Sequence, residues 1–150
     1  MTAIPPRLQE ILDDFALMPD RSARAEYLIE IADRFSAVRV PPEVAQQPYD
    51  EHHRVPACES EAFVWALENP DGTLTYRFDV LNPQGLSAMA MAVVLDETCS
   101  GAPLEQVASV HADIVFALFG KEISMGKGQG LMGLVSMVQH AAKKRLAAEG

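Results

Sequence analysis

The chain has 150 residues, of which 49% are hydrophobic, and its 12 Lys and Arg against 21 Asp and Glu give a formal net charge of −9. This balance disfavours binding to nucleic acid or to anionic membrane surfaces, because both are bound mainly through Lys and Arg. The length fits one domain, residues 1–150. No hydrophobic run is long enough to span a membrane, and the N-terminus lacks a signal-peptide pattern, so we expect a cytoplasmic protein.

Two amphipathic helices are predicted at the start of the chain. Apolar residues recur there at the spacing i, i+3, i+4, i+7, which places them on one helix face. They are Leu8, Ile11, Leu12 and Phe15 in the first helix and Leu28, Ile31, Ala32 and Phe35 in the second. Pro5 or Pro6 suits the first turn of the first helix, and Asp20 or Ser22 can cap the second.

The segment 37–56 separates these helices from the rest of the chain. Its four prolines exclude a continuous helix or a central strand, and they are Pro41, Pro42, Pro48 and Pro56. A connection of this length is unusual inside a compact domain and more often has a functional reason. It leads directly to Cys58.

A β-hairpin is predicted next. Residues 61–67 are rich in strand-forming side chains, and the turn sequence NPDG follows at 69–72. Residues 73–79 then alternate strictly, with Leu74, Tyr76 and Phe78 on one face and a polar face exposed to water. An extended piece just before Cys58 is a candidate third strand.

The remainder is predicted to be helical. Residues 86–95 are mostly apolar and indicate a helix buried on nearly all sides, ending near Gly101. A short turn follows from Pro103 through Val107 and a short helix at 113–119. A loose glycine-rich stretch at 120–130 then leads to a last helix from Leu131. The order predicts an α+β fold, with a small antiparallel sheet of about three strands packed against helices from both chain ends.

Cys58 is the candidate reactive residue. Free cysteines are mostly buried and inert, but Cys58 could also be a metal ligand, half of a disulfide or a nucleophile. Cys58 follows Pro56 and Ala57 at a loop-to-strand junction, where a thiol can be presented on an adjustable loop. The neighbouring charges have both signs: His52, His53 and Arg54 on one side, Glu59 and Glu61 on the other.

The other candidate groups near Cys58 carry weaker signals. The adjacent His52 and His53 near Cys58 could suggest a zinc site. The chain has only two cysteines and no C-x-x-C motif to complete such a site, so we expect no metal and no cofactor. His111 or His140 could serve Cys58 as a base in a cysteine hydrolase or transferase, although no local signature supports this. Cys99 is expected to be incidental, and a disulfide with Cys58 stays open.

Several stretches together resemble the SufE family of sulfur acceptors. They are EYLIEIADRF, the proline-rich loop, HRVPACESEAFVW, and the later GQGL (128–131) with the Ala- and Lys-rich helix behind it. The resemblance implies an IscU-like fold and a sulfur carrier whose Cys58 takes persulfide sulfur from a PLP-dependent cysteine desulfurase of the SufS or CsdA kind. It also implies stimulation of that enzyme and delivery to a SufBCD-type scaffold for iron–sulfur cluster assembly. Such a protein is an accessory of sulfur transfer rather than an independent enzyme.

The chain departs from the family pattern at several matched positions. Family members have Gly-Cys-Gln-Ser where this chain has Ala57-Cys58-Glu59-Ser60, and Lys127 stands where the family has an arginine. Lysine cannot reproduce a bidentate guanidinium contact. The candidate partner-binding or supporting residues are Arg54, Glu59, Ser60, Asp79 and Lys127.

A bound sulfur needs shelter from solvent thiols, and three apolar features are candidate walls. They are Phe63, Trp65 and the helix at 86–95. A non-catalytic scaffold that binds a cluster directly is a further alternative, although two cysteines are few for that role.

Overall fold

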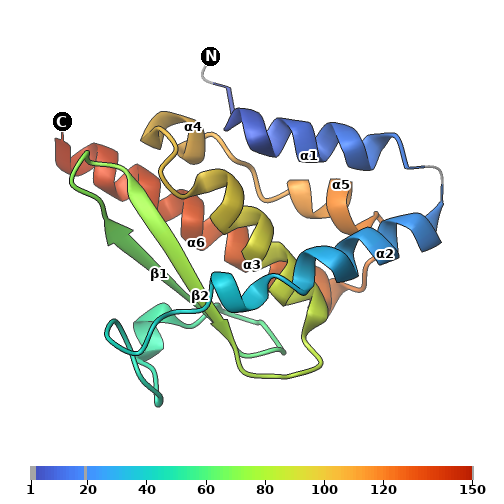
Figure 1. Cartoon of the computed structure of the whole chain (residues 1–150), viewed down its shortest axis with the longest axis horizontal. Coiled ribbons are helices and arrows are strands. Elements are labelled where there is room, and N and C mark those ends of the chain that lie inside the picture. The colour runs from blue at the N-terminus through green and yellow to red at the C-terminus, as the bar shows by residue number, and fades with distance from the viewer. Residues whose placement is uncertain (1–2, 19, 150) are drawn as a thin grey trace.

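The described part of the chain, residues 3–18 and 20–149 of a computed structural model, combines helices with a small sheet (Figure 1). The elements are α1 (Pro6–Ala16), α2 (Arg21–Ala32), the 3-10 turns η1 (Phe35–Ala37) and η2 (Glu51–His53), β1 (Ala62–Glu68), β2 (Leu74–Val80), α3 (Leu86–Cys99), α4 (Leu104–Ala108), α5 (Ile114–Phe119) and α6 (Met125–Glu149). Helices α3 and α6 pack on the sheet, and the N-terminal helices α1 and α2 pack on α3, which confirms the predicted α+β class with helices from both chain ends. None of the described helices is long and apolar enough to cross a membrane.

The sheet is an antiparallel pair of β1 and β2, in a register that runs from Ala62 opposite Val80 to Glu68 opposite Leu74. Side chains alternate between its two faces, because successive residues of a strand point in opposite directions. Val64 and Phe78 face the helices and belong to the main core. The predicted alternation of β2 is therefore confirmed.

The candidate third strand is reduced to a single bridge. Arg54 pairs with Phe63 in an isolated antiparallel bridge, and the N–H of Val55 donates to the carbonyl of Ala62 at 2.8 Å. The pairing ends there because Pro56 has no N–H to donate and Ala57 has a left-handed backbone with φ of 60°.

The outer face of the sheet is covered rather than wet. Val40, Phe63 and Trp65 form a second apolar cluster there. Tyr49, from the proline-rich segment, packs edge-on against Phe63 and Trp65, with ring centroids 5.0 and 4.8 Å away. The predicted water-exposed face is therefore covered by the proline-rich segment. The alternation of side chains in β2 does not show which other segment packs on that face.

Helix α3 is the centre of the main core. It is buried almost all round, as predicted, and it contacts α1, α2, α6 and β2 (Figure 1). Its first turn lies close to the loop that carries Cys58, because Gly85, just before the helix, contacts Ser60.

Helix α6 begins at Met125, six residues earlier than the sequence indicated. Gly126, Gly128 and Gly130 therefore lie inside the helix rather than in a loose entry. Glycine inside a helix costs roughly 1 kcal/mol relative to alanine. The contacts that two of these glycines make with the Cys58 loop explain why the helix contains them.

Candidate functional site around Cys58

Cys58 lies in a short loop, residues 56–61, that is closed at its base. The bridge between Arg54 and Phe63 and the hydrogen bond from Val55 to Ala62 hold the two ends together. Within the loop, the N–H of Glu61 donates to the carbonyl of Cys58 at 3.2 Å. Ala57 and Glu61 both have left-handed backbones, with φ of 60° and 54°, and they turn the chain on either side of the cysteine.

The connection between β2 and α3 fixes one side of this loop. The N–H of Leu81 donates to the carbonyl of Glu61 at 3.1 Å, and the N–H of Asn82 donates to the carbonyl of Ser60 at 3.2 Å. A methyl group at Gly85 would lie 2.8 Å from Oγ of Ser60. Because only a residue without Cβ permits this approach, Ser60 is held tightly against the start of α3.

Helix α6 supports the other side of the loop through its glycines. A methyl group at Gly130 would lie 3.0 Å from Cα of Cys58 and 3.2 Å from its Sγ. A methyl group at Gly126 would lie 3.1 Å from Oε1 of Glu59. The absence of side chains at these positions lets the Cys58 loop rest directly on the helix.

Cys58 borders a cavity of about 70 Å³. Its walls come from the loop and from the first turns of α3 and α6, including Ser60, Leu86, Lys127 and Leu131. A cavity of this size has room for a small group beside the thiol. Cys58 itself is half-buried.

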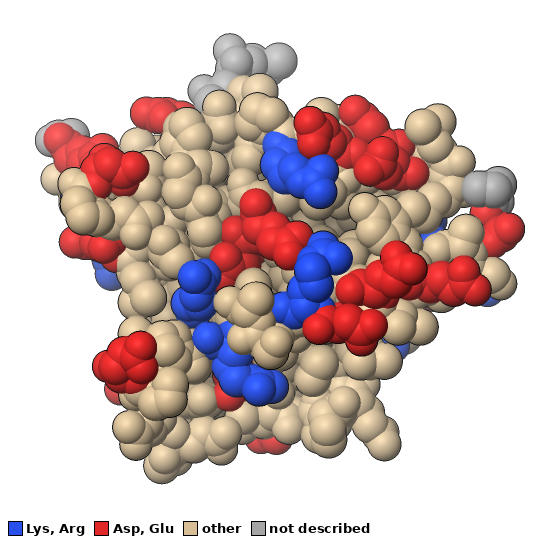
Figure 2. Space-filling model, viewed as in Figure 1, with Lys and Arg blue, Asp and Glu red and all other residues tan. Residues whose placement is uncertain are grey.

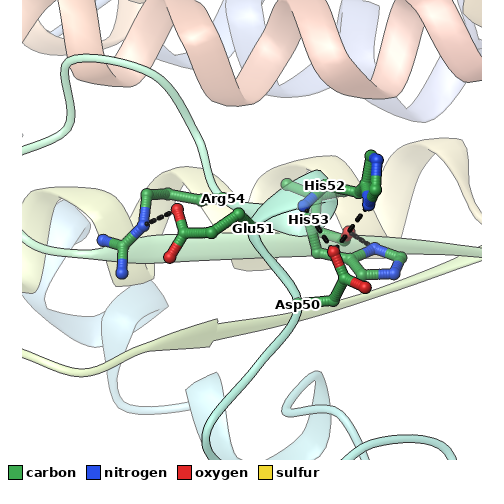
Figure 3. Close-up of polar contacts among 6 residues, drawn as sticks. Asp50, Glu51, His52, His53 and Arg54 are labelled. Carbon is green, nitrogen blue, oxygen red and sulfur yellow. Dashed lines mark hydrogen bonds and ion pairs between the residues drawn. The ribbon is translucent and has the colours of Figure 1, made fainter.

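The turn η2 holds the segment that leads into the loop (Figure 3). The carboxylate of Asp50 accepts from the N–H of His52 at 2.9 Å and lies 2.6 Å from Nδ1 of the same residue. The backbone hydrogen bond and the His52 ring lower the pKa of Asp50. Nδ1 of His53 donates to the carbonyl of Val64 at 2.9 Å, and its ring stacks on Trp65.

Arg54 adds polar contacts at the base of the loop. Its Nε donates to Glu51 at 2.8 Å (Figure 3), and its Nη1 lies 3.7 Å from Glu61. The guanidinium also lies over the ring of Phe63, 4.8 Å from the centroid. The hydrogen-bonded ion pair with Glu51 is the main reason that the pKa of Arg54 is raised. Arg54 therefore ties the turn η2, the loop and β1 together.

The structure brings four predicted site residues together at the cavity: Cys58, Glu59, Ser60 and Lys127. Arg54 lies at the base of the loop, as described above.

Asp79 lies on the outer face of the sheet and is not among the residues that line the cavity. Its carboxylate accepts from the hydroxyl of Tyr49 at 2.7 Å and from Nε of Arg39 at 3.3 Å. Burial, followed by this hydrogen bond, raises the pKa of Tyr49 to about 12. Asp79 thus anchors the proline-rich segment to the sheet.

The cavity walls differ from those expected. Phe63 and Trp65 belong to the outer cluster, and of the three expected features only the start of α3 is a wall. Gly85, Gly130 and Leu131 were not among the predicted site residues, although Gly130 and Leu131 belong to the GQGL stretch that resembles the family. The spacing of Gly126, Gly130 and Gly133 along one helical stretch was the available signal, since residues four and three apart share a helix face.

The described residues that line the cavity include no histidine. His111 is exposed between α4 and α5, with Nδ1 2.9 Å from Asp113. His140 lies on α6, ten residues beyond Gly130, which corresponds to about 15 Å along the helix axis. The arrangement therefore gives no support to a histidine base for Cys58.

Both cysteines are free, and Cys99 is fully buried at the last residue of α3. Because Cys58 borders the first turn of α3, the length of that helix puts about 20 Å between the two thiols, which excludes a disulfide. Burial raises the pKa of Cys99 to about 11. Within the described residues, no group of three or more His, Cys, Asp or Glu could hold a metal ion.

Comparisons with known proteins agree with this geometry. The SufE family model, described as the Fe-S metabolism associated domain, matches residues 9–142. An uncharacterised SufE-like protein of Rhizobium etli is 29% identical, over 94% of this chain and 93% of the relative, and one of Rhizobium meliloti is 25% identical, over 94% and 98%. The solution structure of a hypothetical protein from Thermus thermophilus superposes with a TM-score of 0.74 at 25% identity, covering 96% of this chain and 98% of that one. The chain belongs to the SufE family and has a role in Fe–S metabolism.

Proposed function

We propose that this protein accepts sulfane sulfur on Cys58 from a PLP-dependent cysteine desulfurase, stimulates that enzyme, and passes the sulfur to a SufBCD-type scaffold for iron–sulfur cluster assembly. One observation carries the proposal: a half-buried cysteine lies at the turn of a closed loop, beside a cavity of about 70 Å³. That space has room for one additional sulfur atom beside the thiol.

The transfer step is an exchange at a sulfane sulfur. The Cys58 thiolate attacks the outer sulfur of the desulfurase persulfide and forms a new S–S bond. The original S–S bond breaks, and its electron pair leaves on the desulfurase cysteine as a thiolate. Cys58 then carries the persulfide, and a thiolate of the next acceptor removes its outer sulfur in the same way. Each step conserves oxidation state and requires no other reactant.

The cavity supplies shelter for the resting persulfide. Leu86 and Leu131 line it with apolar side chains, and the loop itself closes it on the side of Ser60. Solvent thiols remove an exposed persulfide by the same exchange reaction, so enclosure extends its lifetime. Glu59, Lys127 and Arg54 lie around the loop, and we assign them to contacts with partner proteins. Asp79 supports the site indirectly by fixing the outer face of the sheet.

Cysteine labelled with radioactive sulfur, together with a purified desulfurase, tests the proposal. Wild-type protein should acquire the labelled sulfur and increase the turnover of the desulfurase, whereas Cys58→Ser should do neither. Cys99→Ser is the matched control, because it removes the other thiol and leaves the loop intact; it should behave as wild type. Sulfur acceptance by Cys58→Ser would contradict the proposal, as would hydrolysis of an ester or amide by wild type without any partner.

A further inference from the structure

A second groove, of about 690 Å³, adjoins the Cys58 cavity and is named here the basic groove. It lies between α2 and the segment that leads from α5 into α6, and its charged lining comprises Arg21, Arg24, Lys121, Lys127 and Glu122. Ser87 and Lys127 line both the groove and the cavity, so a molecule bound in the groove lies beside Cys58.

The groove concentrates unpaired cations in a chain whose other cations are mostly paired. On the face shown in Figure 2, Lys and Arg side chains are interspersed with Asp and Glu side chains. Seven of the cations make ion pairs, namely Arg7, Arg21, Arg34, Arg39, Arg54, Arg77 and Arg145. Within the described residues the other five make none, and three of those, Arg24, Lys121 and Lys127, line the groove.

Arg24 is positioned for an acidic ligand. Its Nε is buried and has no hydrogen-bond partner among the described protein groups. Gly120 leaves room for the guanidinium, since a methyl group there would lie 3.3 Å from Nη1 of Arg24. A buried donor without an acceptor costs free energy, and the guanidinium fork matches the two oxygens of a carboxylate. Nε itself is closed to the groove, but Arg24 lines the groove and none of the described groups forms an ion pair with its guanidinium, whose terminal nitrogens are left for a carboxylate.

We infer that the basic groove binds an acidic segment of the cysteine desulfurase, with one or more carboxylates on Arg24 and Lys121 and an apolar side chain against Leu28 and Phe119. The inference rests on the proposed function, because the molecule that reaches Cys58 is then the desulfurase. Charge complementarity favours a protein carboxylate. The net charge of −9 repels a polyanion such as nucleic acid or a membrane surface outside this small area.

The test compares two charge-matched double variants. Arg24→Gln/Lys121→Gln removes two cations of the groove, and Lys143→Gln/Lys144→Gln removes two unpaired cations from α6 outside it. The rate of sulfur transfer to Cys58 is measured against desulfurase concentration. We expect the half-saturating concentration to rise about tenfold for the first variant and to stay unchanged for the second. Lys121→Gln alone, at an exposed position, should show a smaller rise and guards against misfolding.

Inorganic tetrasulfide separates docking from chemistry, because it loads Cys58 without a protein partner. We expect equal loading of wild type and of Arg24→Gln/Lys121→Gln by this reagent. Equal half-saturating concentrations for all variants would overturn the inference. The inference would also fail if Arg24→Gln/Lys121→Gln lost as much loading with tetrasulfide as with the desulfurase, because the groove would then act on Cys58 itself. Failure of the proposed function looks different, since the wild type then takes no sulfur from the desulfurase.

Discussion

Ala57 and Glu61, which lie on either side of Cys58, are non-glycine residues with left-handed backbone conformations. That conformation costs an alanine roughly 1–2 kcal/mol, because its Cβ crowds the following carbonyl. The hydrogen bonds that close the loop and those from Leu81 and Asn82 hold the backbone in place. The reactive residue is thus positioned by backbone contacts, while its neighbours carry the conformational cost.

Replacement of Ala57 by glycine should increase stability. Glycine adopts φ of 60° without the Cβ clash, and part of that gain is offset by the greater freedom of glycine in the unfolded chain. We expect the free energy of unfolding, measured by urea denaturation, to rise by about 0.5–1 kcal/mol. Ala66→Gly, at an exposed position of β1, is the control and should lower it. Equal losses in both variants would show that Ala57 is unstrained.

Because Cys99 is buried as a neutral thiol, we expect the stability of the protein to fall at alkaline pH. Its folded-state pKa is raised from 9.0 to about 11 by burial, so the unfolded chain loses this proton first. The contribution of Cys99 to stability is complete below pH 9 and is lost as the pH rises towards 11. The loss should be on the order of 2 kcal/mol.

Urea denaturation of wild type and Cys99→Ala at a series of pH values from about 8 to about 11 measures this loss. The substitution lowers stability by a constant amount at low pH, because it leaves a small cavity. The difference between the two proteins should shrink as the pH rises. Parallel profiles would contradict the assignment.

At the scale of elements, the site depends on how closely α6 approaches the loop. Gly126 contacts Glu59, and Gly130 contacts Cys58. At Gly128 an added methyl group would lie 3.6 Å or more from its neighbours, which is an ordinary contact distance. The helix therefore contains glycines of two kinds, one that the loop requires and one that it does not.

Gly130→Ala should disturb the site, and Gly128→Ala should not. An added methyl group at Gly130 forces the Cys58 loop outward, and overpacking of this kind costs about 1–3 kcal/mol. We expect lower stability and a sulfur-transfer rate at least roughly tenfold below wild type. Gly128→Ala should gain up to about 1 kcal/mol from helix propensity and keep the wild-type rate. Similar transfer rates in the two variants would show that close packing on α6 is not needed.

At the scale of the whole molecule, local patterns predicted much of the fold. The spacing of Leu8, Ile11 and Phe15 and the alternation of Leu74, Tyr76 and Phe78 arise from the geometry of single elements, and the structure confirms the helix and the strand. The hairpin turn and the buried α3 were predicted for the same reason.

What the sequence could not show depends on contacts between distant segments. The early start of α6 is compatible with its glycines only because the Cys58 loop packs on them. The proline-rich segment covers Phe63 and Trp65 through long-range contacts that no local pattern shows. Both residues therefore belong to the outer cluster and not to the cavity wall. Asp79 was a predicted supporting residue, but only the structure shows that it accepts a hydrogen bond from Tyr49 on the outer face of the sheet.

Peptide-resolved mass spectrometry shows whether Cys58 is the residue that carries the sulfur. The protein is incubated with a cysteine desulfurase and cysteine, trapped by alkylation and digested. We expect a gain of one sulfur, about 32 Da, on the peptide that contains Cys58, in wild type and in Cys99→Ser. A gain on the Cys99 peptide instead, or no gain on either peptide while the desulfurase is active, would contradict this role of Cys58.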